Sequence, residues 1–241
     1  VELYNEKNEL HVIGKGFSYI FSKKLGAFTS IFFGGKELLK TPMLLDTGRA
    51  PIDNDMHIKK DIFEASGVND PITCPMNIEY ENGEQAKISV DYILCAPANQ
   101  PILHGKCVYT IDGFGGINVE CSANVDEHIE YLPRFGFRLF MPKEYSKVEF
   151  LGKGPLQSSI DMQAASSFGH YKTTTDEQYI HFTKPQECGS HIDTLWCSVC
   201  NDFGSGFIVK NFDGFTFSAL PYSREDIESA KHDFELPEQK E

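Results

Sequence analysis

The segment TGRAPIDNDM, at residues 47–56, is the stretch of this sequence that constrains the backbone most tightly. It cannot continue a helix or a central strand, because Pro51 lacks an amide hydrogen and biases Ala50 towards extended geometry. The three polar residues that follow Ile52 can each fold a side-chain oxygen back onto a nearby backbone amide. The segment therefore predicts a rigid, hydrogen-bonded connection.

Two interpretations of its polar residues are open. In the first, Arg49 pairs with one of the acids and the segment is purely structural. In the second, the segment forms a sugar or cation site from Arg49, Asp53, Asn54 and Asp55. Chemistry alone favours the structural interpretation, because buried arginine and aspartate side chains usually hold each other.

The same segment resembles the Arg-Ala-Pro-x-Asp-Asn-Asp signature of the C-terminal region of glycoside hydrolase family two β-galactosidases, also called the small chain or domain 5. Further matches follow in the family's order and span nearly the whole chain: LPRFG at 132–136, LGKGP at 151–155, YIHFTKPQECGSH at 179–191, PYS at 221–223 and AKHDFEL at 230–236. One such motif would be weak evidence, whereas the ordered set indicates the family.

The resemblance implies a non-catalytic domain. Retaining glycoside hydrolysis needs two carboxylates roughly 5 to 5.5 Å apart, and the family carries both of them, with its magnesium and sodium ligands, on a separate upstream barrel. We therefore expect no catalytic residue, no metal ligand and no cofactor in this chain. Its expected role is to support the barrel and shape the galactoside site. The expected partners are the barrel domain or large subunit, a β-galactoside and a second copy in a possible homo-oligomer.

Two other functions are considered. An autonomous aldose mutarotase or epimerase of the same fold would need a histidine acid and a glutamate base in one cleft. No mutarotase motif surrounds any of the candidate histidines, which are His104, His128, His170, His181 and His191. A carbohydrate-binding or assembly module is the third hypothesis.

Period-two alternation of apolar residues predicts an all-β fold. The clearest predicted strands lie at 10–12, 17–21, 28–33, 88–94, 106–111, 117–123, 135–141, 146–151, 206–209 and 215–220, whereas 61–82 is read as strands interrupted by loops. One short C-terminal helix is expected, with Ser223 and Asp226 as a capping box and an apolar stripe of Ile227 and Ala230 extended by Phe234. His232 is expected to be satisfied by a hydrogen bond.

A chain of 241 residues could form one large β domain or two small ones. Because no linker or repeat is visible, the sequence predicts a single domain over residues 1–241 with two large antiparallel sheets packed face to face. The family resemblance sharpens this to a galactose mutarotase-like supersandwich.

Seven cysteines at irregular spacing predict reduced, mostly buried thiols. The pair Cys197 and Cys200 has the C-x-x-C spacing of zinc or redox sites, but it lies in a predicted strand, where residues three apart point to opposite faces. Similarly, Gly152-Lys153-Gly154-Pro155 is read as a turn at a strand end, since no helix signal follows it.

The chain departs from the family at Gln157, Ser159 and Asp161-Met162, at Cys188, and at Leu195, which precedes Trp196. The family places a sugar-contacting tryptophan after the AKHDFEL motif, beyond Glu241. We therefore expect C-terminal strands to be missing and an uncovered apolar edge to promote self-association.

The net charge of −13 argues against nucleic acid as a partner. No run approaches the length of a membrane span, and the N-terminus lacks a signal-peptide pattern. The expected location is cytoplasmic, with a periplasmic or secreted parent enzyme left open.

Overall fold

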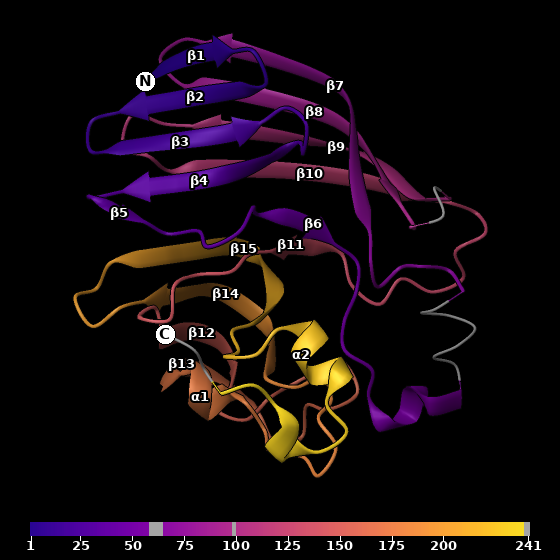
Figure 1. Cartoon of the computed structure of the whole chain (residues 1–241). Helices are drawn as coiled ribbons and strands as arrows, with labels where there is room; N and C mark the ends of the chain where they lie inside the picture. Colours follow the sequence, from indigo (N-terminus) through magenta and orange to yellow (C-terminus); the bar gives the residue numbers. More distant parts are fainter. Residues whose placement is uncertain (58–64, 98–99, 239–241) are drawn as a thin grey trace. The chain divides into compact units, whose positions relative to one another are not determined.

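A computed structural model describes residues 1–57, 65–97 and 100–238 of the chain (Figure 1). Within these residues the fold is dominated by antiparallel strands, which confirms the predicted all-β class. The strands are β1 (Glu2–Glu6), β2 (Glu9–Gly14), β3 (Phe17–Ser22), β4 (Ala27–Phe33), β5 (Lys36–Glu37), β6 (Leu44–Asp46), β7 (Ile72–Asn82), β8 (Ala86–Cys95), β9 (Pro101–Ile111), β10 (Ile117–Val125), β11 (Gly136–Arg138), β12 (Lys147–Gly154), β13 (Ser167–Thr174), β14 (Ser190–Cys200) and β15 (Gly206–Ser218). The helices are α1 (Thr175–Gln178) and α2 (Arg224–Ser229), and 3₁₀ turns lie at η1 (Asp53–His57) and η3 (Asp233–Glu235).

The chain divides into two compact units. Unit 1 comprises Val1–Arg49 and His57–Met141, and unit 2 comprises Ala50–Met56 and Pro142–Glu241. The predicted single domain over 1–241 stays a prediction.

Unit 1 is a sandwich of two antiparallel sheets with strand orders β1-β2-β3-β4-β5 and β10-β9-β8-β7, accompanied by the pair β11-β6. The expected alternation is visible in β3, where Phe17, Tyr19 and Phe21 are buried and their neighbours are not. The rings of Phe21 on β3, Phe28 on β4 and Tyr109 on β9 lie 5.1 to 5.5 Å apart. Because these rings come from both sheets, the sheets pack face to face as predicted.

Unit 2 contains one sheet of order β13-β12-β14-β15. Its buried face carries Val148, Phe150 and Cys197, against which Tyr171 and Phe217 pack. A second apolar cluster lies beneath α2 and holds Ile227. The strand reading of Cys197 and Cys200 is confirmed, because both residues lie on β14.

The predicted C-terminal helix is present as α2. Ser223 is its N-cap, and the reciprocal hydrogen bonds with Asp226 complete the capping box. The apolar stripe is shorter than predicted, because Ala230 is the C-cap and Phe234 lies in the separate turn η3 with 83% of its surface exposed. The additional helix α1 has its own capping box between Thr174 and Glu177.

Strand boundaries differ from the sequence pattern at several places. The strands predicted at 206–209 and 215–220 form one strand, β15 (Gly206–Ser218), in which register shifts replace the expected break. In 135–141 only β11 is a strand. The later part of 61–82 forms the long strand β7, whereas 58–64 lie outside the described residues. The turn predicted at 152–155 is wrong for its first three residues, because β12 continues to Gly154 and pairs with β13 up to that residue, so that the bend begins only at Pro155.

Two predictions about the cysteines are wrong, because the thiols are not all reduced and only Cys107, Cys188 and Cys197 are buried. Cys107 and Cys121 are joined as a disulfide, while the remaining five thiols are free. The physical reason is the register of the β9–β10 hairpin, which places Cys107 directly opposite Cys121. Of the free thiols, Cys188 and Cys197 are buried, and Cys74, Cys95 and Cys200 are partly exposed.

Candidate functional site

Residues 50–53 are anchored on a second motif, the segment at 179–191. The Asp53 amide donates to Gln186 Oε1 at 3.1 Å, and Gln186 Nε2 donates to Asp53 Oδ2 at 3.4 Å. The Ala50 amide donates to Glu187 Oε2 at 2.9 Å. The side chains of Gln186 and Glu187 therefore hold residues 50–53 in place. The sequence does not reveal these contacts, because the two segments lie far apart in it.

Asp55 has a structural role within this segment. It is 4% exposed, and its Oδ2 accepts a hydrogen bond from the Ile52 amide at 2.8 Å. In return the Asp55 amide donates to the Ile52 carbonyl at 2.9 Å. This reciprocal pair closes the turn η1, as expected for an aspartate that folds back onto the backbone.

The four predicted sugar-site residues separate into two groups. Asp53, Asn54 and Asp55 share η1, with Asp53 and Asn54 exposed and Asp55 turned inward. Arg49 is partly buried, and its backbone is fixed by Asn69, whose Oδ1 accepts from the Arg49 amide and whose Nδ2 donates to the Arg49 carbonyl at 3.1 Å. A sugar-binding role for these residues stays a prediction.

Four of the motifs contribute residues to one apolar cluster of unit 2, here called the motif cluster. Its buried members are Ala50, Tyr179, Cys188 and Ile227, and its partly buried members are Ile180, Phe182, Leu220, Tyr222 and Leu236. All but two of them come from the segments at 47–56, 179–191, 221–223 and 230–236; Leu220 directly precedes the third segment, and Ile227 lies on α2 between the last two. These four motifs thus build a packed core.

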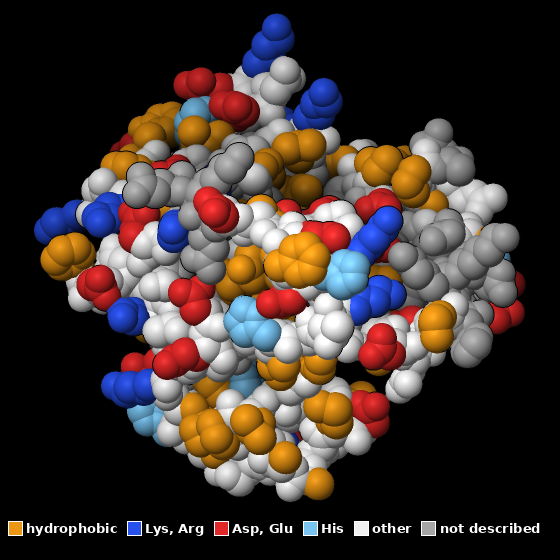
Figure 2. All heavy atoms as spheres, turned by 60° about the horizontal axis from the view of Figure 1, so that its bottom comes forward, with side chains coloured by type: hydrophobic (Ala, Val, Ile, Leu, Met, Phe, Trp, Pro, Cys, Tyr) orange, Lys and Arg blue, Asp and Glu red, His pale blue; other side chains and the backbone are white. Residues whose placement is uncertain are grey.

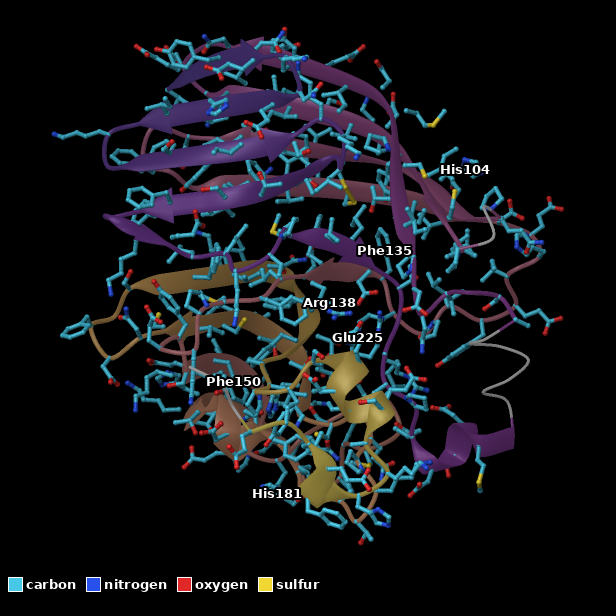
Figure 3. The ribbon with its side chains drawn as sticks, in the orientation of Figure 1. His104, Phe135, Arg138, Phe150, His181 and Glu225 are labelled. Atoms are coloured by element: carbon cyan, nitrogen blue, oxygen red, sulfur yellow. A yellow bond between two sulfur atoms is a disulfide. The ribbon has the colours of Figure 1, made fainter. Side chains whose placement is uncertain are left out.

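A polar group borders the motif cluster. Asp233 Oδ1 accepts from the Tyr179 hydroxyl at 3.3 Å, and Asp233 Oδ2 lies 2.8 Å from Nδ1 of His181, the residue labelled in Figure 3. Burial and the neighbouring Asp233 carboxylate raise the pKa of Tyr179, so this phenol stays protonated at neutral pH. The group ties η3 to the segment after α1.

His191 is a buried core residue. Its Nδ1 donates to the Lys153 carbonyl at 2.8 Å, its Nε2 contacts the side-chain amide of Gln178, and its ring lies 4.3 Å from that of Phe150. Burial lowers the pKa of His191. A fully enclosed imidazole with both nitrogens engaged is unsuited to proton transfer with a ligand.

The other candidate histidines are spread over the molecule. His128 pairs with Asp126 at 2.6 Å, His170 pairs with Glu149 at 2.7 Å, and His104 is exposed on β9. On the face shown in Figure 2, histidine, acidic and hydrophobic side chains are interspersed. Among the described residues, no group of three or more His, Cys, Asp or Glu side chains could hold a metal ion.

A hollow of about 640 Å³ opens where the β7–β8 and β9–β10 turns meet. Its lining combines charged and polar side chains with one aromatic ring, that of Phe114, which is 89% exposed. None of the four predicted sugar-site residues lines it.

Comparison with known proteins identifies the family. The sequence model of a family described as the beta galactosidase small chain matches residues 13–241. The chain belongs to the β-galactosidase small-chain family. This membership confirms the resemblance that the ordered motifs indicated.

The curated proteins that resemble this chain include several bacterial β-galactosidases. The chain is 31% identical over 238 residues to the β-galactosidase of Actinobacillus pleuropneumoniae, an alignment that covers 98% of this chain and 23% of that protein. For the β-galactosidases of Staphylococcus xylosus and Priestia megaterium the identities are 30% and 27%, with 91% and 96% of this chain and 22% of each relative covered. The small chain thus spans less than a quarter of the length of the curated relatives it matches.

No helix among the described residues is both long and apolar enough to cross a membrane.

Proposed function

We propose that this chain is the non-catalytic C-terminal part of a β-galactosidase, which supports the catalytic barrel and helps to shape the galactoside site. The observation that carries the proposal is the family membership together with the chain's share of its relatives, 22 to 23% of their length. A segment of that size, matched over nearly its whole extent, is one part of a larger enzyme.

The contacts of the motif residues support a scaffolding role. Asp53 and Asp55, the carboxylates of the segment that could serve as catalytic groups, are instead hydrogen-bonded to Gln186 and to the Ile52 amide, respectively. Aromatic and aliphatic residues of four motifs fill the motif cluster. These interactions stabilise a rigid surface, which is what a domain that orients a neighbouring active site requires.

Within this role we assign the exposed part of η1 to the sugar side of the interface. Asp53 and Asn54 present polar side chains on a turn whose backbone is fixed at Ala50, Ile52 and Asp53. Preorganised polar groups of this kind can bind sugar hydroxyls without an ordering cost. Arg49 joins them in the proposal, and no cofactor or metal is assigned to this chain.

The test is a chimera built on a relative. This chain replaces the matched segment of the Actinobacillus pleuropneumoniae β-galactosidase, and turnover of a nitrophenyl β-galactoside is compared with that of the enzyme from which the segment is deleted. The proposal expects measurable turnover by the chimera and none by the deletion.

Two further variants of the chimera locate the sugar contact. Asn54→Ala should raise KM at unchanged thermal stability, whereas Ser229→Ala, an exposed substitution on α2, should leave KM unchanged. A folded chimera that is as inactive as the deletion would contradict the supporting role, and an unchanged KM in Asn54→Ala would contradict the assignment of η1.

A further inference from the structure

Two cysteines that are distant in the sequence meet on neighbouring strands of unit 1. Cys74 on β7 lies opposite Ile93 of β8, and Cys95 on β8 lies opposite Ile72 of β7. Residues two apart on a strand point to the same face, so Cys95 shares the face of Ile93 and hence that of Cys74. The two thiols are therefore diagonal neighbours on one face of the hairpin.

This face is turned away from the core of unit 1. Tyr92 and Leu94, which alternate with Ile93 and Cys95, are 2% and 0% exposed and point inwards. Both thiols, by contrast, are partly exposed. His104, labelled in Figure 3, lies opposite Ile93 on the next strand and is exposed on the same face. Dissolved reagents can thus reach the thiols.

The two thiols interact with each other. Burial, together with a side-chain hydrogen bond to Cys74, raises the pKa of the Cys95 thiol. Among the described residues, no group of three or more His, Cys, Asp or Glu side chains could jointly bind a metal. The site therefore offers two sulfur ligands, which suits centres of low coordination number and not tetrahedral zinc.

We propose that Cys74 and Cys95 form a dithiol site that binds one soft, thiophilic ion or metalloid centre through both sulfurs. Thiolates select soft centres. With an organoarsenic(III) oxide, two arsenic–sulfur bonds replace the arsenic–oxygen bonds, and both thiol protons leave with the oxygen as water. No electron is transferred, so the step needs neither oxidant nor reductant. The second bond is intramolecular, which makes capture by the pair far stronger than by one thiol.

The C-x-x-C pair provides an internal comparison. Cys197 and Cys200 are three residues apart on β14 and so point to opposite faces. Cys197 packs with Val148 and Phe150, and burial raises its pKa to about 12. This pair has the sequence spacing of a dithiol site without the geometry, whereas Cys74 and Cys95 have the geometry without the spacing.

The test treats the full 241-residue chain, with its Cys107–Cys121 disulfide intact, with phenylarsine oxide. After a brief wash with a monothiol and gel filtration, intact mass spectrometry measures the arsenical that is retained. The wild type should retain one group per chain. Cys74→Ser and Cys95→Ser should each lower retention at least about tenfold, because only one bond then remains. Cys200→Ser should retain as much as the wild type.

Two results would overturn the site. The first is no retained arsenical on the wild-type chain. The second is that Cys74→Ser retains as much arsenical as the wild type, which would show that other cysteines bind it. Circular dichroism and a melting curve verify that each variant is folded, and Cys74→Ala replaces the serine variant if that one fails this check.

Discussion

At position 191 the interior accommodates a neutral imidazole better than a charged one. His191 is 0% exposed, and burial lowers its pKa from the ordinary value of 6.5. Below pH 6.5 the unfolded chain binds a proton that the folded chain resists. Stability is therefore fully present above that pH and is lost as pH falls towards the lowered folded pKa.

The free energy of unfolding should fall between about pH 7 and pH 5.5, by at most about 1.4 kcal/mol per pH unit from this one group. His191→Gln should be less stable at neutral pH and should show a flatter pH dependence in urea unfolding. The exposed His104→Gln is the control and should keep the wild-type slope. If His191→Gln shows the wild-type slope of unfolding free energy against pH, His191 is not the source of the pH dependence.

Asp55 and Asn54 are adjacent but should respond differently to substitution. Asp55→Ala leaves the Ile52 amide without its acceptor, the buried Asp55 carboxylate, at a cost of about 1 to 3 kcal/mol in unfolding free energy. The exposed Asn54→Ala should change it by less than about 0.5 kcal/mol. Chemical denaturation measures both, and equal effects would show that Asp55 does not hold the turn.

Residue-level chemistry could be predicted where it is local. The hydrogen bond of Asp55 to its own turn can be predicted from the sequence. The hydrogen bonds of Ala50 to Glu187 and of Asp53 to Gln186 cannot, because the partners lie more than 130 positions apart. The disulfide was missed although a signal existed. Cys107 and Cys121 lie at equal distances from the predicted turn at 112–116, which implies that they face each other.

At the scale of elements, β9 contains a glycine that its neighbours require. A Cβ at Gly105 would lie 2.2 Å from the Ser122 carbonyl oxygen and 2.4 Å from the Tyr92 hydroxyl. These are the two atoms that join β8 to β10 by a hydrogen bond of 3.1 Å. The strands can approach in this way only without a side chain at position 105.

Gly105→Ala should therefore lower the unfolding free energy by about 1 to 3 kcal/mol, because the sheet must shift to admit the methyl group. Gly83→Ala is the matched control, since its nearest atom, Gln85 O, lies at an ordinary contact distance of 3.7 Å. Thermal melts of both proteins test this. A Gly105→Ala protein as stable as Gly83→Ala would contradict the close approach.

Elements with a clear period were predicted, and those without one were not. Strand β8 shows strict alternation and was found, as was α2 through its capping box. Helix α1 has only four residues, too few for a period, although its Thr174–Glu177 capping box was visible. Strand β15 was split in two because Asn211, Asp213 and Gly214 interrupt the alternation where its register shifts.

At the scale of the molecule, the order of motifs predicted the family and the all-β sandwich. It did not predict that residues 50–56 belong to the same compact unit as 142–241. That grouping depends on contacts such as Ala50 with Glu187 and the packing of Ala50 into the motif cluster. Periodicity reports which face of a strand is buried, but not which distant segment covers it.

The central claim is that this chain supports catalysis performed elsewhere in a β-galactosidase. Turnover of a nitrophenyl β-galactoside by the purified 241-residue chain tests it most directly. We predict a rate indistinguishable from that of buffer at every chain concentration. A rate that rises in proportion to the chain, saturates with substrate and is inhibited by galactose would contradict it.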